Sequence, residues 1–313
     1  MSAFNFTTAK GFVLSSVLAL CFAATAWGQG RSYGLALGTS HYVGDLGAKN
    51  GTAPGKATDM RASRIALTGF VEWPIEGKWQ VHTALSYIHV TGDDRFADSP
   101  SRVARNLHFR SSVVELQARG QFKFWDRPRH WNRSAGSRGY VFLGVGAFTY
   151  NPKSRIRMEA NDVVNPIWYT LRELKTEGQE EPYGWLALSM PMGVGFDWNL
   201  RGGWQVGMEV GWRYTTTDYL DDVSHTYGNP DQMSEIAALL SSQANAYTLA
   251  LAGPEGGFIE DHTYSATNPT PRGNPDSRDG FGTVQFTLSR PDATLRTRPG
   301  SWVGRFRRRG WLR

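Results

Sequence analysis

The sequence predicts an all-β protein: an eight-stranded antiparallel transmembrane β-barrel with long extracellular loops and short periplasmic turns. Three observations in its 313 residues predict this fold. Residues 204–214 alternate strictly between apolar side chains and polar side chains or glycine, as on a strand with one apolar face. Seven other segments show a related pattern, at the length of about 9–11 residues that a strand needs to cross a bilayer. The connections between these segments alternate between short and long, which is the outer-membrane pattern.

The N-terminal segment is predicted to be a secretory signal. Residues 12–26 are apolar or small but too short for a membrane-spanning helix, and small residues at 26 and 28 suit cleavage. We favour cleavage after Gly28, with Ala26 as the alternative. This divides the chain into a signal peptide (1–28), an outer-membrane β-barrel (29–290) and an Arg-rich periplasmic tail (291–313). Cys21, the single cysteine, would leave with the signal, which excludes disulfides and thiolate metal sites from the mature chain.

The eight strands follow in order from the alternation of side chains. Pro191 cannot donate a ladder hydrogen bond, so it predicts a bulge or local break in the sixth strand. The facing of the fifth strand is ambiguous because it contains two glycines. The expected ranges are 32–43, 64–73, 79–90, 107–125, 140–150, 185–198, 204–214 and 281–288.

The connections predict which end of the barrel is which. Residues 74–77 and 199–203 are tight turns and 126–138 is longer, whereas the other connections are long loops, one of them with a predicted helix near 235–240. Five tryptophans fall at the turn end, as in the aromatic girdle of an outer-membrane barrel: Trp73, Trp79, Trp125, Trp198 and Trp204. Both termini are therefore expected in the periplasm.

Charged residues are predicted on the inward face of several strands. An eight-stranded barrel has an interior just wide enough for side chains, so these charges must be paired. We expect a structural plug of ion pairs and keep a proton or ion path as the alternative. The inward set is Arg64, Glu72, His82, Glu115, Arg119, Glu209 and Arg213.

An acidic cluster follows the seventh strand: Asp218, Asp221, Asp222 and His225. Carboxylates and a histidine on a barrel rim could activate a water for hydrolysis, and several carboxylates could hold Ca²⁺. Aspartates also cap turns through local backbone bonds. We expect the turn role, with no catalytic, cofactor or metal site, and therefore no enzyme.

The positive charge of the chain is concentrated at its end. The formal net charge is +6, and residues 291–313 alone contain seven arginines against one aspartate. The net positive charge thus comes from the tail and does not indicate a nucleic-acid-binding face. Arginine offers a rigid fork of donors for carboxylate partners. We expect an acidic periplasmic partner to dock on the turn arginines Arg127, Arg129 and Arg133 and on the tail arginines Arg305, Arg307, Arg308 and Arg309.

A set of short motifs lies at the strand ends. Their residues at the rim and turns are Tyr42, Gly44, Asp45, Gly47, Arg105, Asn106, Leu107, Asn151, Pro152, Asp218, Tyr219, Leu220, Asp221, Asp222, Ser224, Arg272, Gly273 and Asp279. In this order the motifs resemble the PorG-like outer-membrane barrel family of the type IX secretion system in Bacteroidota. The resemblance covers about residues 31–290, and its most specific part is the stretch 217–224.

The resemblance implies a non-enzymatic accessory or anchoring barrel of a type IX-like protein secretion apparatus. Its implied partners are outer-membrane lipid and the periplasmic ring or lipoprotein components of the machine. Two alternatives belong to other classes. One is a small outer-membrane channel or binding barrel for small molecules, and the other is an outer-membrane hydrolase that uses Asp221, Asp222 and His225.

Overall fold

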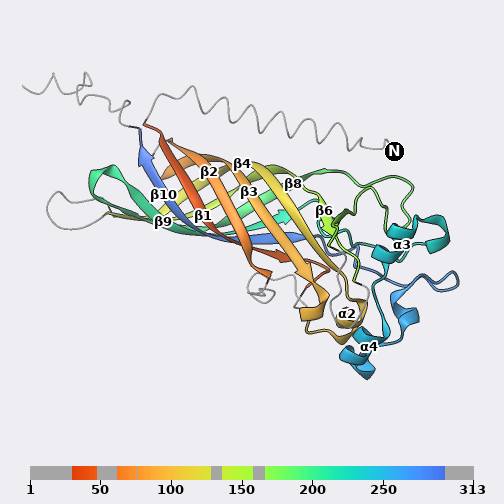
Figure 1. Ribbon diagram of the computed structural model, residues 1–313. Helices are drawn as coiled ribbons and strands as arrows, with labels where there is room; N and C mark the ends of the chain where they lie inside the picture. Colours follow the sequence, from red (N-terminus) through yellow and green to blue (C-terminus); the bar gives the residue numbers. More distant parts are fainter. Residues whose placement is uncertain (1–29, 48–61, 76, 128–135, 158–165, 293–313) are drawn as a thin grey trace, which may run out of the picture.

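Eight long strands form the body of the molecule (Figure 1). The computed structural model describes residues 30–47, 62–75, 77–127, 136–157 and 166–292. The predicted signal segment and nearly all of the Arg-rich tail therefore lie outside the described residues. The strands are β1 (Ser32–Val43), β2 (Arg64–Pro74), β3 (Trp79–Asp93), β4 (His108–Arg127), β5 (Ser137–Thr149), β8 (Leu186–Asn199), β9 (Gln205–Thr215) and β10 (Gly280–Pro291).

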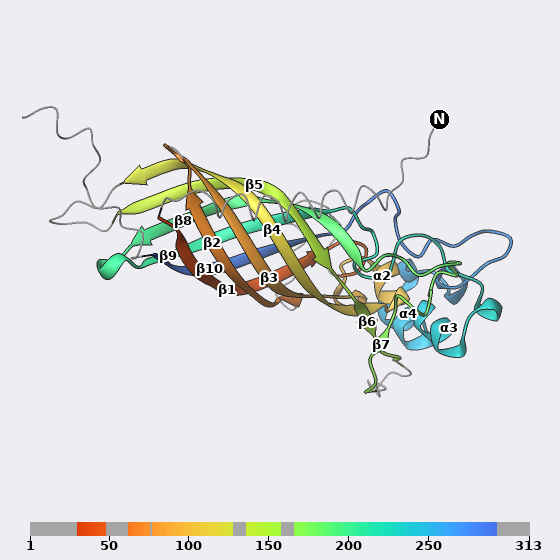
Figure 2. The ribbon, with the colours of Figure 1, turned by 90° about the horizontal axis from the view of Figure 1, so that it is seen from above.

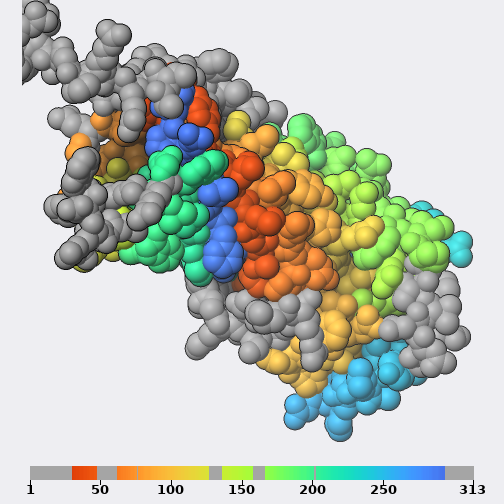
Figure 3. Space-filling view, turned by 60° about the vertical axis from the view of Figure 1, so that its left-hand side comes forward, coloured from red at the N-terminus to blue at the C-terminus, as the bar shows by residue number. Residues whose placement is uncertain are grey.

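The eight strands close into an antiparallel barrel, as predicted. Each strand pairs with the next along the chain, β5 with β8 included, and β1 pairs with β10 along its whole length. Figure 3 shows β10 in blue lying directly against β1 in red. Closure removes the sheet edges, so the backbone hydrogen bonds of the strands are satisfied within the wall.

The two ends of the barrel differ in their connections. At one end, called the turn end, the connections 75–78, 128–136 and 200–204 are short, and the last contains η3 (Arg201–Gly203). At the other, called the loop end, the connections 44–63, 94–107, 150–185 and 216–279 are long (Figures 1 and 2). The loops contain η2 (Asp94–Phe96), α2 (Pro100–Arg105), β6 (Pro152–Ser154), β7 (Tyr169–Thr170), η4 (Pro230–Gln232), α3 (Glu235–Ser241), α4 (Ala246–Ala252), η5 (Pro254–Gly256) and η6 (Ile259–His262).

The helix expected near 235–240 is α3, which Ser234 caps by accepting a hydrogen bond from the Ala237 amide. The helix α4 was not predicted. Within the described part of the chain, no helix has the length and apolar character to cross a membrane.

The outer wall carries the apolar band of an outer-membrane-type barrel. Large apolar side chains on alternate positions are exposed around the wall, among them Leu35, Leu67, Leu85, Leu143, Val194, Val210 and Phe286. In β5 the outward set is Val141, Leu143 and Val145, which resolves the facing that the sequence left ambiguous. At the turn end, Trp79, Trp125, Trp198 and Trp204 are 40–55% exposed, as a girdle requires. Trp73 departs from the prediction because it is only 7% exposed.

The local break predicted at Pro191 lies in the ladder between β5 and β8. β8 itself is continuous through Pro191, without a bulge, but two residue pairs are missing from its ladder with β5 there. A second irregularity, which was not predicted, lies between Lys123 and Trp125 of β4, where the register with β5 shifts. A bulge places two consecutive residues outward, which explains why Phe124 and Trp125 are both exposed.

Candidate functional site

The barrel interior is filled by a network of ion pairs. Arg119 donates to both carboxylate oxygens of Glu209, at 2.7 and 2.5 Å, and the Tyr140 hydroxyl donates to Glu209 as well. Arg213 donates from Nε to Glu115 at 3.1 Å. These four charged groups are almost completely buried, so each is paired where solvent cannot compensate it.

A third set of charges closes the interior toward the turn end. Arg138 lies between Asp197, to which it donates from two nitrogens, and Glu72 at 3.3 Å. His82 stacks on Phe70 with ring centroids 4.8 Å apart and contacts Arg119. The cavity enclosed by these side chains holds only about 10 Å³, room for about one water.

The inward list from the sequence is thus confirmed except at one position. Arg64 is exposed, because it lies at the loop-end start of β2, where the barrel no longer encloses it. Arg138 and Asp197 were missing from the list, although both alternate inward on their strands.

A second polar network lies above the barrel mouth and is called the loop cap here. It is built by residues from all four long loops, and most of the rim residues that carry the family resemblance belong to it. Its members are Tyr42, Asp45, Asp94, Arg105, Asn106, Leu107, Glu177, Tyr183, Asp218, Tyr219, Leu220, Asp221, Asp222, Ser224, Arg272, Gly273 and Asp279.

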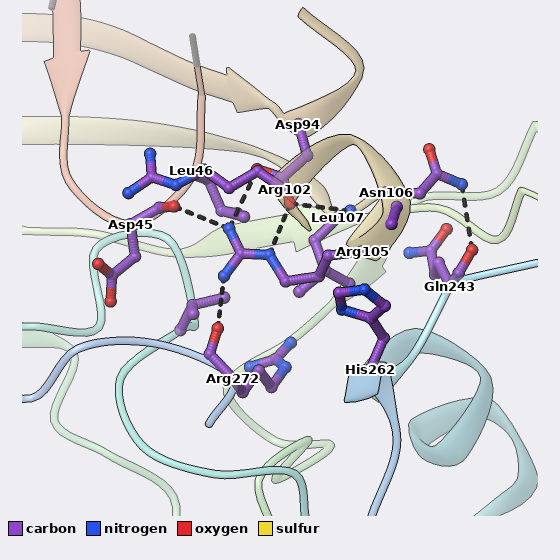
Figure 4. Close-up of polar contacts among 12 residues, drawn as sticks. Asp45, Leu46, Asp94, Arg102, Arg105, Asn106, Leu107, Gln243, His262 and Arg272 are labelled. Carbon is purple, nitrogen blue, oxygen red and sulfur yellow. Dashed lines mark hydrogen bonds and ion pairs between the residues drawn. The ribbon is translucent and has the colours of Figure 1, made fainter. Parts of the chain in front are cut away.

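Arg105, at the end of α2, joins three of the loops (Figure 4). It donates to both oxygens of Asp94, at 2.7 and 3.1 Å, to the Asp45 carbonyl at 2.8 Å and to the Arg272 carbonyl. Asp94 also accepts from the Leu107 amide. Asn106 has φ = 58°, a left-handed conformation that ends α2 and directs its side-chain amide to the Gln243 carbonyl.

Tyr42 joins two carboxylates at the end of β1. Its hydroxyl oxygen lies 2.6 Å from Asp221 Oδ2 and 2.6 Å from Asp279 Oδ1. A phenol has one proton to donate, so both short contacts are favourable when one of the two carboxyl groups is protonated. Burial raises the pKa of both Asp221 and Asp279 well above the ordinary value, and neighbouring negative charge adds to the shift.

Arg272 holds the other side of the loop cap. It donates to Glu177 at 3.2 Å, to Asp222 Oδ2 at 3.3 Å and to the Asp222 carbonyl at 2.5 Å. Asp222 also accepts from Thr176 and from Tyr183, and its φ of 74° is unusual for a buried aspartate. Burial raises the Asp222 pKa to about 6, partly offset by the Arg272 charge.

Close packing requires two glycines, Gly273 in the loop cap and Gly44 beside it. A Cβ at Gly44 would overlap both the Tyr42 hydroxyl and Asp279 Oδ1. A Cβ at Gly273 would lie 2.5 Å from Asp45 Oδ2 and 2.8 Å from the Ser224 amide nitrogen. Gly47 serves differently, because its φ of 113° is disfavoured for other residues.

The remaining rim residues take local roles. Ser224 donates to Asp218 Oδ2, while Asp218 Oδ1 is buried without a partner among the described residues. Burial raises the Asp218 pKa to about 7. Leu220 is buried and donates its amide to Asp279. Asn151 and Pro152 lie apart from the cap, where the chain passes from β5 into β6.

The proposed hydrolase residues do not converge. Asp221 faces Tyr42, whereas Asp222 faces Arg272. His225 is exposed, stacks on Tyr219 and lies 3.9 Å from Glu177. The described residues contain no group of three or more histidine, cysteine or acidic side chains placed to hold a metal ion.

Sequence reasoning missed Asp94 and Glu177, the carboxylates that face Arg105 and Arg272. Nothing in their local sequence distinguishes them, because their partners lie in other loops. Among the expected docking arginines, only Arg127 falls within a described strand, at the end of β4. Arg129, Arg133, Arg305, Arg307, Arg308 and Arg309 lie outside the described residues.

Comparisons with known proteins place the chain in a family. No curated protein matches the sequence. Ail of Yersinia pestis matches with 10% identity and a TM-score of 0.32 over 84% of this chain and 99% of Ail. OprG of Pseudomonas aeruginosa matches with 10% identity and a TM-score of 0.31 over 84% of this chain and 97% of OprG. Likenesses this distant carry no functional inference.

The family model described as "Domain of unknown function (DUF6089)" matches residues 11–237, more than half of the sequence. The chain therefore belongs to the DUF6089 family.

Proposed function

We propose that this protein is a non-enzymatic, non-conducting outer-membrane barrel that acts as an accessory or anchoring component of a type IX-like secretion apparatus. In this role the barrel fixes periplasmic ring or lipoprotein components to the outer membrane. The resemblance of the rim motifs to the PorG-like family suggests that the partner apparatus is a type IX-like secretion system. The loops then face outward and both termini lie in the periplasm.

The filled interior is the observation that supports an anchoring role. The pairs Arg119–Glu209 and Arg213–Glu115 cross the lumen, and the space left beside them is about 10 Å³. Because so little space is left beside these pairs, we infer that the lumen does not conduct and that the protein acts through the surfaces at its two ends.

The expected docking surface is the turn end with the tail. Arg127, Arg129 and Arg133 belong to the connection after β4, and the four tail arginines follow β10. Exposed ion pairs each contribute only ~0–1 kcal/mol, so several arginines must act together on an acidic partner.

Affinity capture from crosslinked outer membranes tests this function. Deletion of residues 291–313 combined with Arg127→Gln, Arg129→Gln and Arg133→Gln should reduce recovery of the periplasmic partner, and more so at high salt. A control for the location of the charge is Arg172→Gln with Lys175→Gln at the loop end, which removes two cations without touching the turn end. If the altered barrel inserts and retains the partner undiminished, docking at these arginines is wrong.

A further inference from the structure

A basic and aromatic patch lies on the outer wall of the barrel near its loop end. It consists of Arg110, Lys153, Arg155 and Trp168 and is called the wall patch here. β6 continues the ladder between β4 and β5 in the same register beyond the end of β5, and β7 pairs with β6, so this part of the wall extends past the barrel mouth (Figure 2). The four side chains are all partly exposed.

The wall patch continues directly from the apolar band. Val114 and its cross-strand neighbour Tyr87 are outward, 43% and 45% exposed. Arg110 precedes Val114 by four residues on β4 and therefore lies on the same outward face, about 13 Å nearer the loop end. The wall patch thus lies where a lipid-facing surface gives way to water.

The cations of the wall patch are crowded. Lys153 lies directly opposite Arg110 in the β4–β6 ladder, and like charges in this position are destabilising. The guanidinium carbon of Arg110 lies 3.6 Å from the Trp168 ring centroid, and that of Arg155 lies 5.2 Å from it. The ring attracts both guanidinium groups but carries no net charge to neutralise them.

The charges of the wall patch are not balanced by carboxylates of the described residues. Neither Arg110 nor Arg155 forms an ion pair with any of them, and Arg155 Nε is buried without a hydrogen-bond partner there. Asp93, the acidic residue at the neighbouring end of β3, is already held by Arg157 at 2.6 Å. Two guanidinium groups that share one indole and have no carboxylate partner among the described residues form a site for an external anion.

We propose that the wall patch binds the phosphate group of an anionic lipid in the leaflet at the loop end. Arg110 and Arg155 donate to the phosphate oxygens, Lys153 adds charge, and Trp168 lies at the membrane–water boundary, where its amphipathic ring is favoured. A lipid is chosen over free phosphate because the wall patch is continuous with the apolar band that acyl chains cover. This inference is independent of the periplasmic docking proposed above.

Native mass spectrometry of the full chain in a neutral detergent tests this site. The probes are phosphatidic acid and diacylglycerol with identical acyl chains, with inorganic phosphate as a competitor. The variant Arg110→Gln/Arg155→Gln should bind phosphatidic acid roughly twenty-five-fold more weakly than the unaltered chain, given about a fivefold contribution from each interfacial arginine. Diacylglycerol should bind weakly to both proteins.

Two further variants separate the site from general charge and folding effects. Arg110→Lys/Arg155→Lys keeps both charges and should recover most of the affinity. Arg172→Gln/Lys175→Gln removes the same charge elsewhere on the loop end and should leave affinity unchanged; heat-modifiable gel mobility reports folding of each variant.

Equal phosphatidic acid binding by the Gln variant and the unaltered chain would overturn the proposal. Equal binding of diacylglycerol, or complete displacement by millimolar inorganic phosphate, would overturn the assignment to a lipid phosphate. If the Gln variant does not fold, the salt dependence of the unaltered chain decides: binding that is unchanged by raised salt contradicts a phosphate site.

Discussion

The barrel interior and the loop cap are both buried polar networks, but they balance charge in different ways. Inside the barrel, Arg119 faces Glu209 and Arg213 faces Glu115, so each cation has a carboxylate of its own. In the loop cap, Asp221 and Asp279 meet at Tyr42, and Asp218 has only a hydroxyl donor. The interior is stabilised by ion pairs whose partners the strand register places opposite each other. The cap combines the ion pairs of Arg105 and Arg272 with carboxyl groups that are protonated or bound only by hydrogen bonds, and loop geometry places them. The two regions should therefore respond differently to mutation and to pH.

The largest effect is expected from breaking one interior pair. Arg119→Met leaves Glu209 charged and buried, which should lower the free energy of unfolding by about 3–5 kcal/mol. Urea unfolding of the refolded barrel, followed by tryptophan fluorescence, measures this loss. The double variant Arg119→Met/Glu209→Met removes both charges and should recover most of it. If the double variant is no more stable than the single one, the pair is not the cause.

The next effect should be confined to the loop cap. Arg105→Met removes the cation that faces Asp94 and the donor to two loop carbonyls. This should lower the free energy of local opening of the cap by about 3 kcal/mol while the barrel stays closed. Hydrogen exchange at the Leu107 amide should accelerate, and exchange in β9 should not. Equal acceleration in both places would show that cap and barrel open as one unit.

A smaller effect is expected from the packing of Gly44. The extra methyl of Gly44→Ala meets Tyr42 and Asp279, and such overpacking costs about 1–3 kcal/mol. Limited proteolysis of the loops at increasing urea concentration measures it. Gly30→Ala is the matched control, because a Cβ there meets nothing within 4 Å. Similar protease sensitivity of the two variants would refute a packing role for Gly44.

The smallest effect is a pH dependence of the loop cap alone. The Asp218 pKa is about 7 in the folded chain, above the ordinary value of 3.8, so the protonated form favours the folded cap. This stabilisation is fully present below about pH 4 and is lost as the pH rises through about 7. The cap should therefore resist protease better at pH 5 than at pH 8, with Asp218→Asn reducing the difference. An unchanged or reversed difference in that variant would assign the pH dependence to other groups.

The strands could be predicted from the sequence because side-chain alternation is a local property. The eight ranges, the exposed Val210 and the inward Glu209 all follow from period two. The β4 bulge could not be predicted, since it depends on the pairing with β5. Arg64 was placed inside because alternation does not show where the barrel mouth ends.

The sequence predicted several residues of the loop cap but not their contacts. Motif resemblance identified Arg105, Arg272 and Asp279, but not that they meet. Their contacts with Asp94, Glu177 and Tyr42 join segments that are far apart in the chain and depend on closure of the barrel. The pairing of Arg119 with Glu209, 90 residues apart, was unpredictable for the same reason.

We propose that paired charges close the lumen, so that the protein acts through the surfaces at the two ends of the barrel. Single-channel recording of the full chain in planar bilayers tests it most directly. The unaltered protein should give no stable ion current, because the lumen beside Arg119, Arg138 and Glu209 has room for about one water. Regular, voltage-stable current steps from the unaltered protein, altered in size or ion selectivity by Arg119→Met/Glu209→Met, would contradict a closed lumen and favour a channel.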